Sequence, residues 1–206
     1  MNFEFARENM IKQQVMPEGI EYGSLIEAMS SIAREDFLPR QYKNLAYCDT
    51  NLVLETREIK SPMLTAKLLN ALDIKKTDNV LMLGVECGYT AALLAKISKS
   101  VEILDYCDEM LGQTRRNLAS LEIFNAEFNN AEHLTNILEN DKKYNCAFIT
   151  SVVGEGDIDE SLFALLELGG RMIFVVQTSV CNKAYLVTKV SSNFYDKEFL
   201  FDIYNK

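Results

Sequence analysis

The sequence predicts an α/β fold with a doubly wound, mostly parallel sheet of seven strands. An N-terminal helical extension precedes the sheet, and a C-terminal antiparallel hairpin completes it. From Asn79 to Val176, short apolar strands alternate with helical segments, which is typical of a parallel sheet with helices on both faces. The first strand, residues 79–83, is a continuous apolar run that stops at Gly84, and a helix opens at Gly88.

The other elements of the sheet follow from the same alternation. The expected strands are 79–83, 101–104, 126–128, 146–150 and 171–176, and the expected helices between them are 89–98, 108–121, 131–138 and 158–166. Gly169-Gly170 is expected to turn the chain into the fifth strand. Residues 185–190 and 198–204 are rich in apolar side chains with no long helix between them, which predicts an antiparallel hairpin at the sheet edge.

The beginning of the chain has a helical pattern. Its expected elements are helices at 3–15, 22–32 and 62–72 and an extended stretch at 49–55. Pro62 suits the first position of the third helix, and Ser61 suits its N-cap. We expect residues 1–206 to form a single domain, with an extension at 1–75 and a sheet-containing core at 76–206.

Composition excludes several classes of function. The chain is 48% hydrophobic and 25% charged, as in ordinary globular proteins, and its formal net charge of −9 disfavours binding to nucleic acid and to anionic membranes. No apolar run approaches the roughly 20 residues of a membrane helix, and we expect no signal peptide. Five scattered cysteines without a C-x-x-C pair, and a single His133, predict reduced thiols, a cytoplasmic location and no metal site.

A ligand site is expected beyond the carboxyl ends of the strands, next to the first strand. The turn from Gly84 to Gly88 is one part of it, and Asp105, 21 residues after Gly84, has the spacing of an acid that binds ribose hydroxyls. Asn130 follows the third strand, where an amide oxygen could accept a hydrogen bond from an adenine amino group. Glu86 would place negative charge against a pyrophosphate, which disfavours a dinucleotide.

Segments along nearly the whole chain resemble the protein-L-isoaspartate O-methyltransferases, and in particular a divergent bacterial branch of that family. The resembling segments are Ala6 to Val15, Leu25 to Pro39, Leu45-Ala-Tyr47 with Asp49, Gly88 to Ala95, and Gly169-Gly-Arg171. The resemblance implies a Rossmann-like class I methyltransferase fold with S-adenosylmethionine as cofactor. It also implies methyl transfer to the carboxylate of L-isoaspartyl residues in damaged proteins, a repair reaction.

The implied chemistry needs little from side chains. A carboxylate is already ionised near pH 7 and requires no general base, so catalysis consists mostly of positioning. The implied partner is a protein or peptide that contains isoaspartyl residues, and the enzyme itself is expected to be a monomer or a weak dimer. The resemblance gives Gly84, Val85, Glu86, Gly88, Asp105, Tyr106 and Asn130 as cofactor-binding candidates. It gives Lys60 and Ser61 as catalytic candidates.

Four positions depart from the family pattern. Met82 stands in place of an acid before the cofactor turn, and Glu86 replaces the middle glycine of that turn. Asn130 replaces the aspartate that follows the third strand, and Lys60 replaces the serine of the active-site Ser-x-Pro.

Two of the substitutions introduce opposite charges, which predicts an ion pair between Lys60 and Glu86 across the mouth of the cofactor site. The pair could plug the site, or Lys60 could hold a substrate carboxylate. Three functions therefore remain open. They are isoaspartyl methylation, a decayed methyltransferase that acts as a binding or scaffold protein, and methylation of another carboxylate or small molecule with Lys60 as the anion anchor.

Overall fold

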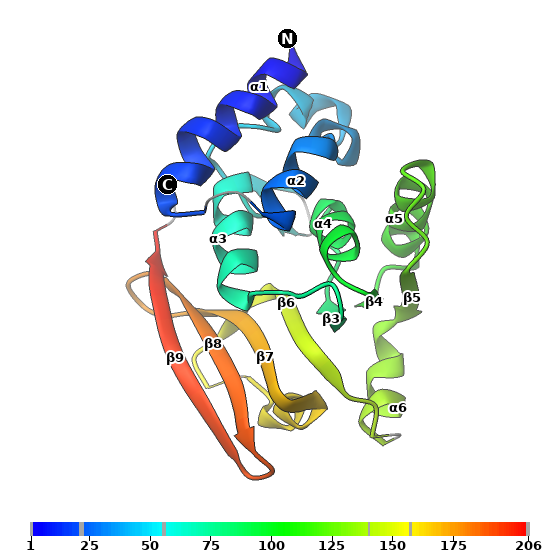
Figure 1. Cartoon of the computed structure of the whole chain (residues 1–206), viewed down its shortest axis with the longest axis vertical. Helices are drawn as coiled ribbons and strands as arrows, with labels where there is room; N and C mark the ends of the chain where they lie inside the picture. Colours follow the sequence, from blue (N-terminus) through cyan, green and yellow to red (C-terminus); the bar gives the residue numbers. More distant parts are fainter. Residues whose placement is uncertain (1, 21–22, 55–56, 140, 157, 205–206) are drawn as a thin grey trace.

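The computed structural model describes residues 2–20, 23–54, 57–139, 141–156 and 158–204. A seven-stranded sheet in the order β5-β4-β3-β6-β7-β8-β9 forms the centre of the molecule (Figure 1). Its strands are β3 (Asn79–Leu83), β4 (Ser100–Asp105), β5 (Ala126–Asn130), β6 (Tyr144–Gly154), β7 (Leu166–Gln177), β8 (Asn182–Ser191) and β9 (Phe194–Ile203). The strands from β5 to β7 are parallel, and β8 is antiparallel to both of its neighbours, so the predicted fold class is confirmed.

The helices lie close to their expected positions. They are α1 (Phe3–Met10), continued by the π-helical η1 (Ile11–Val15), then α2 (Ser24–Ser31), α3 (Pro62–Leu72), α4 (Tyr89–Ile97), α5 (Asp108–Ser120) and α6 (Leu134–Glu139). The remaining short helices are η2 (Met16–Glu18), η3 (Arg34–Phe37), η4 (Arg40–Leu45), η5 (Ala131–His133) and η6 (Glu160–Leu165). The expected extended stretch contains β1 (Leu52–Val53), which pairs with β2 (Glu58–Ile59) further along the chain. Residues 22, 55 and 56, on which parts of the expected segments fall, lie outside the described part of the chain.

Alternating side chains of the strands supply two hydrophobic layers. Val80 and Met82 of β3 belong to the cluster that includes buried residues of α1 to α5, and both are at most 1% exposed. Leu81 belongs to the cluster on the other face, with buried residues of η6. A strand covered on both faces must be apolar at every position, which explains the uninterrupted run in β3.

Two expectations near β7, the fifth of the expected strands, are wrong. Gly169 and Gly170 do not precede β7 but lie within it, where the register advances by five positions in β7, from Leu166 to Arg171, and by two positions in β6. Gly169 has φ +77, and a Cβ on Gly170 would lie 2.8 Å from the Glu167 carbonyl oxygen, so the pair forms a bulge that other residues would not permit.

The expected helix at 158–166 is the shorter 3₁₀ helix η6. The carboxylate of Asp159 accepts a hydrogen bond from the Ser161 amide at 2.9 Å, which starts the helix late. Since β7 already begins at Leu166, only the six residues Glu160–Leu165 remain for this helix.

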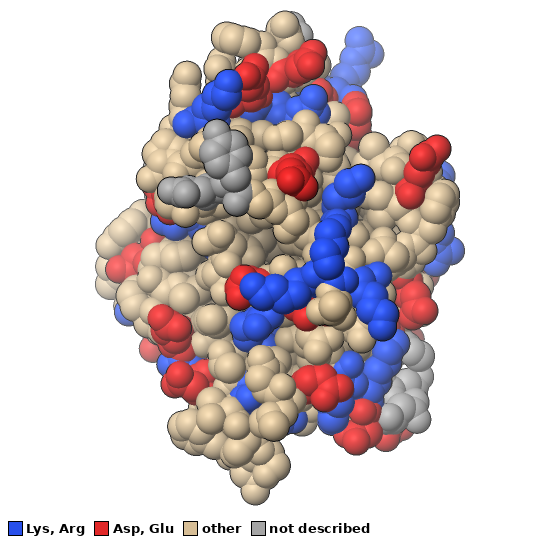
Figure 2. Space-filling model, viewed as in Figure 1, with Lys and Arg blue, Asp and Glu red and all other residues tan. Residues whose placement is uncertain are grey.

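Charge is unevenly distributed over the surface. Figure 2 shows Lys and Arg side chains gathered across the middle of one face, although the net charge is −9. Within the described ranges, no helix has the length and apolarity to cross a bilayer. The same residues bring no three His, Cys, Asp or Glu side chains into a metal-binding arrangement.

Gly88 is required by both backbone conformation and packing. Its φ is +90, and a Cβ there would lie 2.7 Å from Thr114 Oγ1 of α5. We expect Gly88→Ala to lower the free energy of unfolding by about 2–4 kcal/mol, through left-handed strain and overpacking. Urea unfolding monitored by circular dichroism measures the change.

Gly112 provides a matched control, since it lies inside α5 and a Cβ there meets only Arg116, at 3.6 Å. Gly112→Ala is expected to stabilise the protein by about 0.5–1 kcal/mol. Equal effects of the two substitutions would contradict the assignment of Gly88 as a close-contact position.

Candidate functional site

The main candidate site is a cavity of about 690 Å³ at the carboxyl ends of β3, β4 and β6. Its lining consists of Arg57, Glu58, Lys60, Leu83, Gly84, Val85, Glu86, Leu104, Asp105, Tyr106, Cys107, Ala131, Leu134, Ile149, Thr150, Ser151 and Val152. The strand order reverses here, because β4 and β6 flank β3 on opposite sides. The cavity is therefore at the position predicted for a ligand, and its volume suits a small molecule.

The turn after β3 has a glycine-type backbone with a glutamate at its centre. Gly84, Glu86 and Gly88 have φ values of +89, +56 and +90. A Cβ on Gly84 would lie 2.1 Å from Thr150 Oγ1 of β6, so glycine permits this close approach. The left-handed conformation of Glu86 costs about 1–2 kcal/mol relative to an ordinary one.

Asp105 lies at the end of β4, where the sequence predicted an acid. One carboxylate oxygen accepts from the Cys107 amide at 2.8 Å, and the other accepts from the Val85 amide, also at 2.8 Å. The guanidinium of Arg57 lies 3.3 Å from the second oxygen and also donates to the Glu86 carbonyl at 3.4 Å. A carboxylate offers about four acceptor positions, so most of those on Asp105 are already filled.

The predicted ion pair between Lys60 and Glu86 is confirmed. Lys60 Nζ lies 2.7 Å from Glu86 Oε1, and the two side chains are only 6% and 5% exposed. Lys60 Nζ also donates to the Thr150 carbonyl, and Glu86 Oε2 accepts from Thr90 Oγ1 at 3.4 Å. Because both charges are removed from water, each depends on the other for compensation.

The main chain on both sides of Lys60 is held by hydrogen bonds. Arg34 donates to the Lys60 carbonyl at 2.7 Å, and the Ser61 amide donates to Asn51 Oδ1 at 2.8 Å. Arg34 is 1% exposed, and its guanidinium stacks 5.2 Å from the centre of the Tyr89 ring in α4. The loop that carries Lys60 is thereby tied to the helix that follows the turn.

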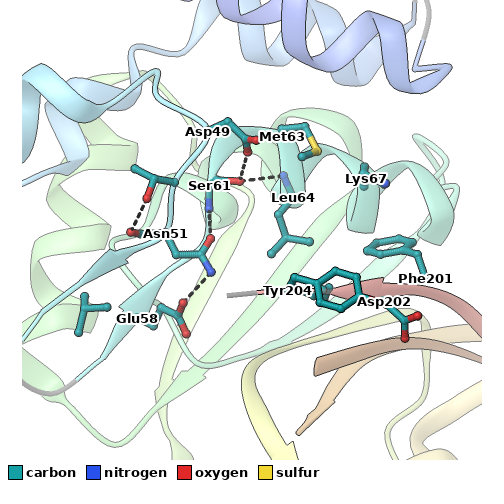
Figure 3. A pocket seen from close by; sticks show the side chains of 13 residues that line it. Asp49, Asn51, Glu58, Ser61, Met63, Leu64, Lys67, Phe201, Asp202 and Tyr204 are labelled. Carbon is teal, nitrogen blue, oxygen red and sulfur yellow. Dashed lines mark hydrogen bonds between the residues drawn. The ribbon is translucent and has the colours of Figure 1, made fainter. Parts of the chain in front are cut away.

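Ser61 faces a different cavity, of about 430 Å³ (Figure 3). That cavity is lined by Asp49, Thr50, Asn51, Val53, Glu58, Ser61, Met63, Leu64, Lys67, Phe201, Asp202, Ile203 and Tyr204. Ser61 Oγ accepts from the Leu64 amide at 3.2 Å and donates to Asp49 at 3.0 Å, so Ser61 caps α3 as predicted. Lys60 and Ser61, both proposed as catalytic, thus serve separate cavities.

The other predicted residues divide into two groups. Val85 and Tyr106 line the main cavity, and Tyr106 is 78% exposed. Gly88 and Asn130 do not line it. Asn130 caps η5, since its Oδ1 accepts from the Glu132 amide at 3.1 Å, and its Nδ2 donates to Asp108 at 3.0 Å. The structure therefore does not bring this amide to a position facing the cavity.

Sequence reasoning missed several residues of the site. Arg57 belongs to a polar stretch between two structured segments, and its basic character in an acidic chain was the one available signal. Thr150 reaches the site only through the register of β6 against β3, in which Leu83 pairs with Ile149. Arg34 lay within a segment that resembled the family, but only the folded chain places it under the Lys60 loop.

Comparison with known proteins identifies the family. The family model described as protein-L-isoaspartate(D-aspartate) O-methyltransferase matches residues 6–200. The chain belongs to this family. The prediction of an S-adenosylmethionine-dependent methyltransferase with the family's isoaspartyl specificity is thereby confirmed at the level of the family.

Individual relatives agree with this assignment. The chain is 30% identical to the protein-L-isoaspartate O-methyltransferase 2 of Pelobacter propionicus, over 86% of this chain and 78% of that protein. It is 27% identical to the Geobacter metallireducens protein-L-isoaspartate O-methyltransferase, over 92% of this chain and 87% of that one.

Two solved structures support the family's fold. A protein-L-isoaspartate O-methyltransferase superposes with a TM-score of 0.79 at 23% identity, covering 96% of this chain and 65% of that longer one. A putative family member from Plasmodium falciparum, solved with S-adenosyl-L-homocysteine, superposes with a TM-score of 0.73 at 18% identity, covering 100% and 99%.

A double-mutant cycle tests the buried pair of the site. Lys60→Met and Glu86→Gln should each lower the free energy of unfolding by about 3–5 kcal/mol, because each leaves an uncompensated buried charge. The double variant should lose about 1–3 kcal/mol less than the sum of the single changes. Chemical denaturation of the four proteins gives the coupling.

The exposed pair Lys75–Asp73, at 2.5 Å, serves as the control, and Lys75→Met should leave the denaturation midpoint unchanged. Additive single effects at Lys60 and Glu86 would show that the two charges do not stabilise one another.

Cys87 should be an inert thiol although it lies within the turn. It is 5% exposed, and burial raises the pKa of the thiol, an effect that the charge of Arg34 only partly opposes. Since the thiolate is the nucleophile, raising the pKa lowers reactivity at any given pH. In the native protein, mass spectrometry after treatment with a thiol reagent at pH 8 should find Cys87 unmodified and the part-exposed Cys107 modified. Modification of Cys87 at the same rate without denaturant would refute this.

Proposed function

We propose that this protein transfers the methyl group of S-adenosylmethionine to the carboxylate of L-isoaspartyl residues in damaged cytoplasmic polypeptides. The observation that carries the proposal is Asp105, held beside Gly84 and Val85 at the rim of the main cavity, in a chain of this family. We further propose that it acts as a single-domain monomer or weak dimer.

The residues of the cavity fit the cofactor in both of its halves. The carboxylate of Asp105 and the apolar side chains of Leu104, Leu134 and Ile149 suit a ribose and a base. Glu86 suits the positive charge of the sulfonium and ammonium groups. Arg57 occupies one acceptor position of Asp105, so it must leave or share that carboxylate when a ribose binds.

The chain's own residues then have distinct proposed roles. Gly84 and Val85 bring main chain to the cofactor, and Asp105 orients its ribose. Lys60, where the family has serine, faces the substrate carboxylate and orients it. When bound, the cofactor supplies an electrophilic methyl group and a neutral thioether leaving group. Ser61 acts through the cap of α3 and keeps the loop in register.

A second candidate function is a binding or scaffold role without methyl transfer. The observation that favours it is that two carboxylates of the cavity are already paired with cations of the chain, Asp105 with Arg57 and Glu86 with Lys60. A third candidate, methylation of another carboxylate, would use the same Lys60 as its anion anchor.

Methyl transfer to matched peptides tests the proposed function. With labelled S-adenosylmethionine, an isoaspartyl peptide should gain a methyl ester and the aspartyl peptide of the same sequence should not. Asp105→Asn should weaken cofactor binding by about tenfold or more in calorimetry, because it removes a charged acceptor. Glu109→Gln, on an exposed position of α5, should leave cofactor binding unchanged.

The outcomes separate the three candidates. Binding of S-adenosylmethionine without methylation of the isoaspartyl peptide would favour another carboxylate substrate. The absence of binding heat and of a thermal shift at millimolar cofactor would favour the scaffold role.

A further inference from the structure

We propose that Lys60 exchanges the carboxylate of Glu86 for the carboxylate of the substrate. The exchange makes Glu86 a selective site for the positively charged methyl donor over its neutral thioether product. Lys60 and Glu86 are thus specificity-determining residues that couple substrate binding to cofactor choice. This inference rests on the proposed function, because it assumes an adenosine cofactor and a carboxylate substrate in the main cavity.

The ion pair neutralises the part of the cavity in which it lies. Lys60 and Glu86 both line the cavity, and their charged atoms are 2.7 Å apart. While they are paired, the carboxylate offers little attraction to a cationic ligand, because an equal positive charge lies in contact with it. A ligand of either charge state therefore meets a nearly neutral surface.

The exchange requires movement of one side chain and not of the loop. Arg34 holds the Lys60 carbonyl, Asn51 holds the Ser61 amide, and Ile59 is fully buried. The main chain is therefore held on both sides of Lys60, whereas the flexible four-carbon stem offers several rotatable bonds through which the ammonium group can be redirected. The Thr150 carbonyl is a second acceptor that does not depend on Glu86.

A substrate carboxylate is chemically equivalent to the group that Lys60 already binds. It can replace Glu86 as the partner of the ammonium without a change in the number of charged hydrogen bonds on Lys60. Among the described residues, the carboxylate of Glu86 then keeps the long contact with Thr90, 3.4 Å, and loses the ammonium of Lys60 as its counter-ion. Such a group strongly favours a nearby positive charge, because water compensates it poorly.

The two ligands of the cavity differ by the required charge. S-adenosylmethionine carries a sulfonium, an ammonium and a carboxylate, a net charge of +1, whereas the thioether product is neutral overall. Glu86 distinguishes them only when Lys60 has left it, which happens when a substrate is bound. Glu86 has a left-handed backbone, φ +56, which is unfavourable for a residue with a side chain. Such strained residues cluster at functional sites, which agrees with a functional role for Glu86.

The coupling must be reciprocal. If a bound carboxylate tightens binding of a cationic cofactor by some factor, the cationic cofactor tightens binding of that carboxylate by the same factor. The product complex loses this advantage when the sulfonium becomes a thioether, so methyl transfer itself weakens the retention of the product.

Calorimetry on the intact protein tests the exchange. The two adenosine probes are S-adenosylhomocysteine and an unreactive analogue in which a protonated amine replaces the methylsulfonium. Each is titrated with saturating isoaspartyl peptide, and again with the same peptide carrying isoasparagine, which has no charge. The preference for the amine analogue should be about tenfold greater with the isoaspartyl peptide. Equal preferences with the two peptides would overturn the proposal.

Variants identify the residues responsible. Glu86→Gln should abolish the dependence of the preference on the peptide, and Lys60→Met should show the full preference for the cationic probe without any peptide. A peptide-dependent preference that survives in Glu86→Gln would overturn the role of Glu86. The comparison of peptides on the unchanged protein still decides the question where a variant does not fold.

Failure of the proposed function is recognised separately. If the unchanged protein and Lys60→Met bind neither adenosine probe, both the proposed cofactor site and the exchange are wrong. If the probes bind with the expected preference but no methyl ester forms on the isoaspartyl peptide, the exchange stands and the proposed reaction falls.

Discussion

The arrangement of the site depends on the neutralisation of two acids by two cations that flank the short strand β2. Lys60 compensates Glu86 inside the cavity, and Arg57 compensates Asp105 at its rim. The two ion pairs differ in burial. The Lys60–Glu86 pair is almost fully buried, whereas the side chain of Arg57 is 21% exposed. Burial makes the first pair the more costly to leave uncompensated, and this requirement links the loop to the turn after β3.

The turn beside the cavity has close contacts between its glycines and threonine side chains. Gly84 permits the close approach of Thr150 of β6, and Gly88 permits that of Thr114 of α5. Glu86 has the same left-handed backbone as the two glycines and projects its carboxylate into this crowded region. A glutamate in a left-handed conformation therefore adds charge to the turn.

Local sequence features correctly predicted those helices and strands whose limits are set by residues next to one another in the chain. The apolar run 79–83 and the Ser61-Pro62 helix start were sufficient to place β3 and α3 within a residue of their observed limits. The prediction failed at η6, where a longer helix was expected, and at the Gly169 bulge, where a turn before the strand was expected. At η6 the few residues left before β7 decided the conformation, whereas at Gly169-Gly170 the register of β7 against β6 placed the glycine pair in a bulge inside the strand.

The sequence by itself determined the family, the doubly wound sheet and the position of Asp105 and Glu86 at its carboxyl edge, because strand and turn patterns are encoded over a few residues. It also indicated the Lys60–Glu86 pair, since opposite charges replaced two family residues that face one site. Only the tertiary structure decided that Arg57 reaches Asp105, that Asn130 caps a helix, and that Ser61 turns to a second cavity. These outcomes depend on contacts between residues far apart in the chain, such as Lys60 and Thr150, which strand register and loop path bring together.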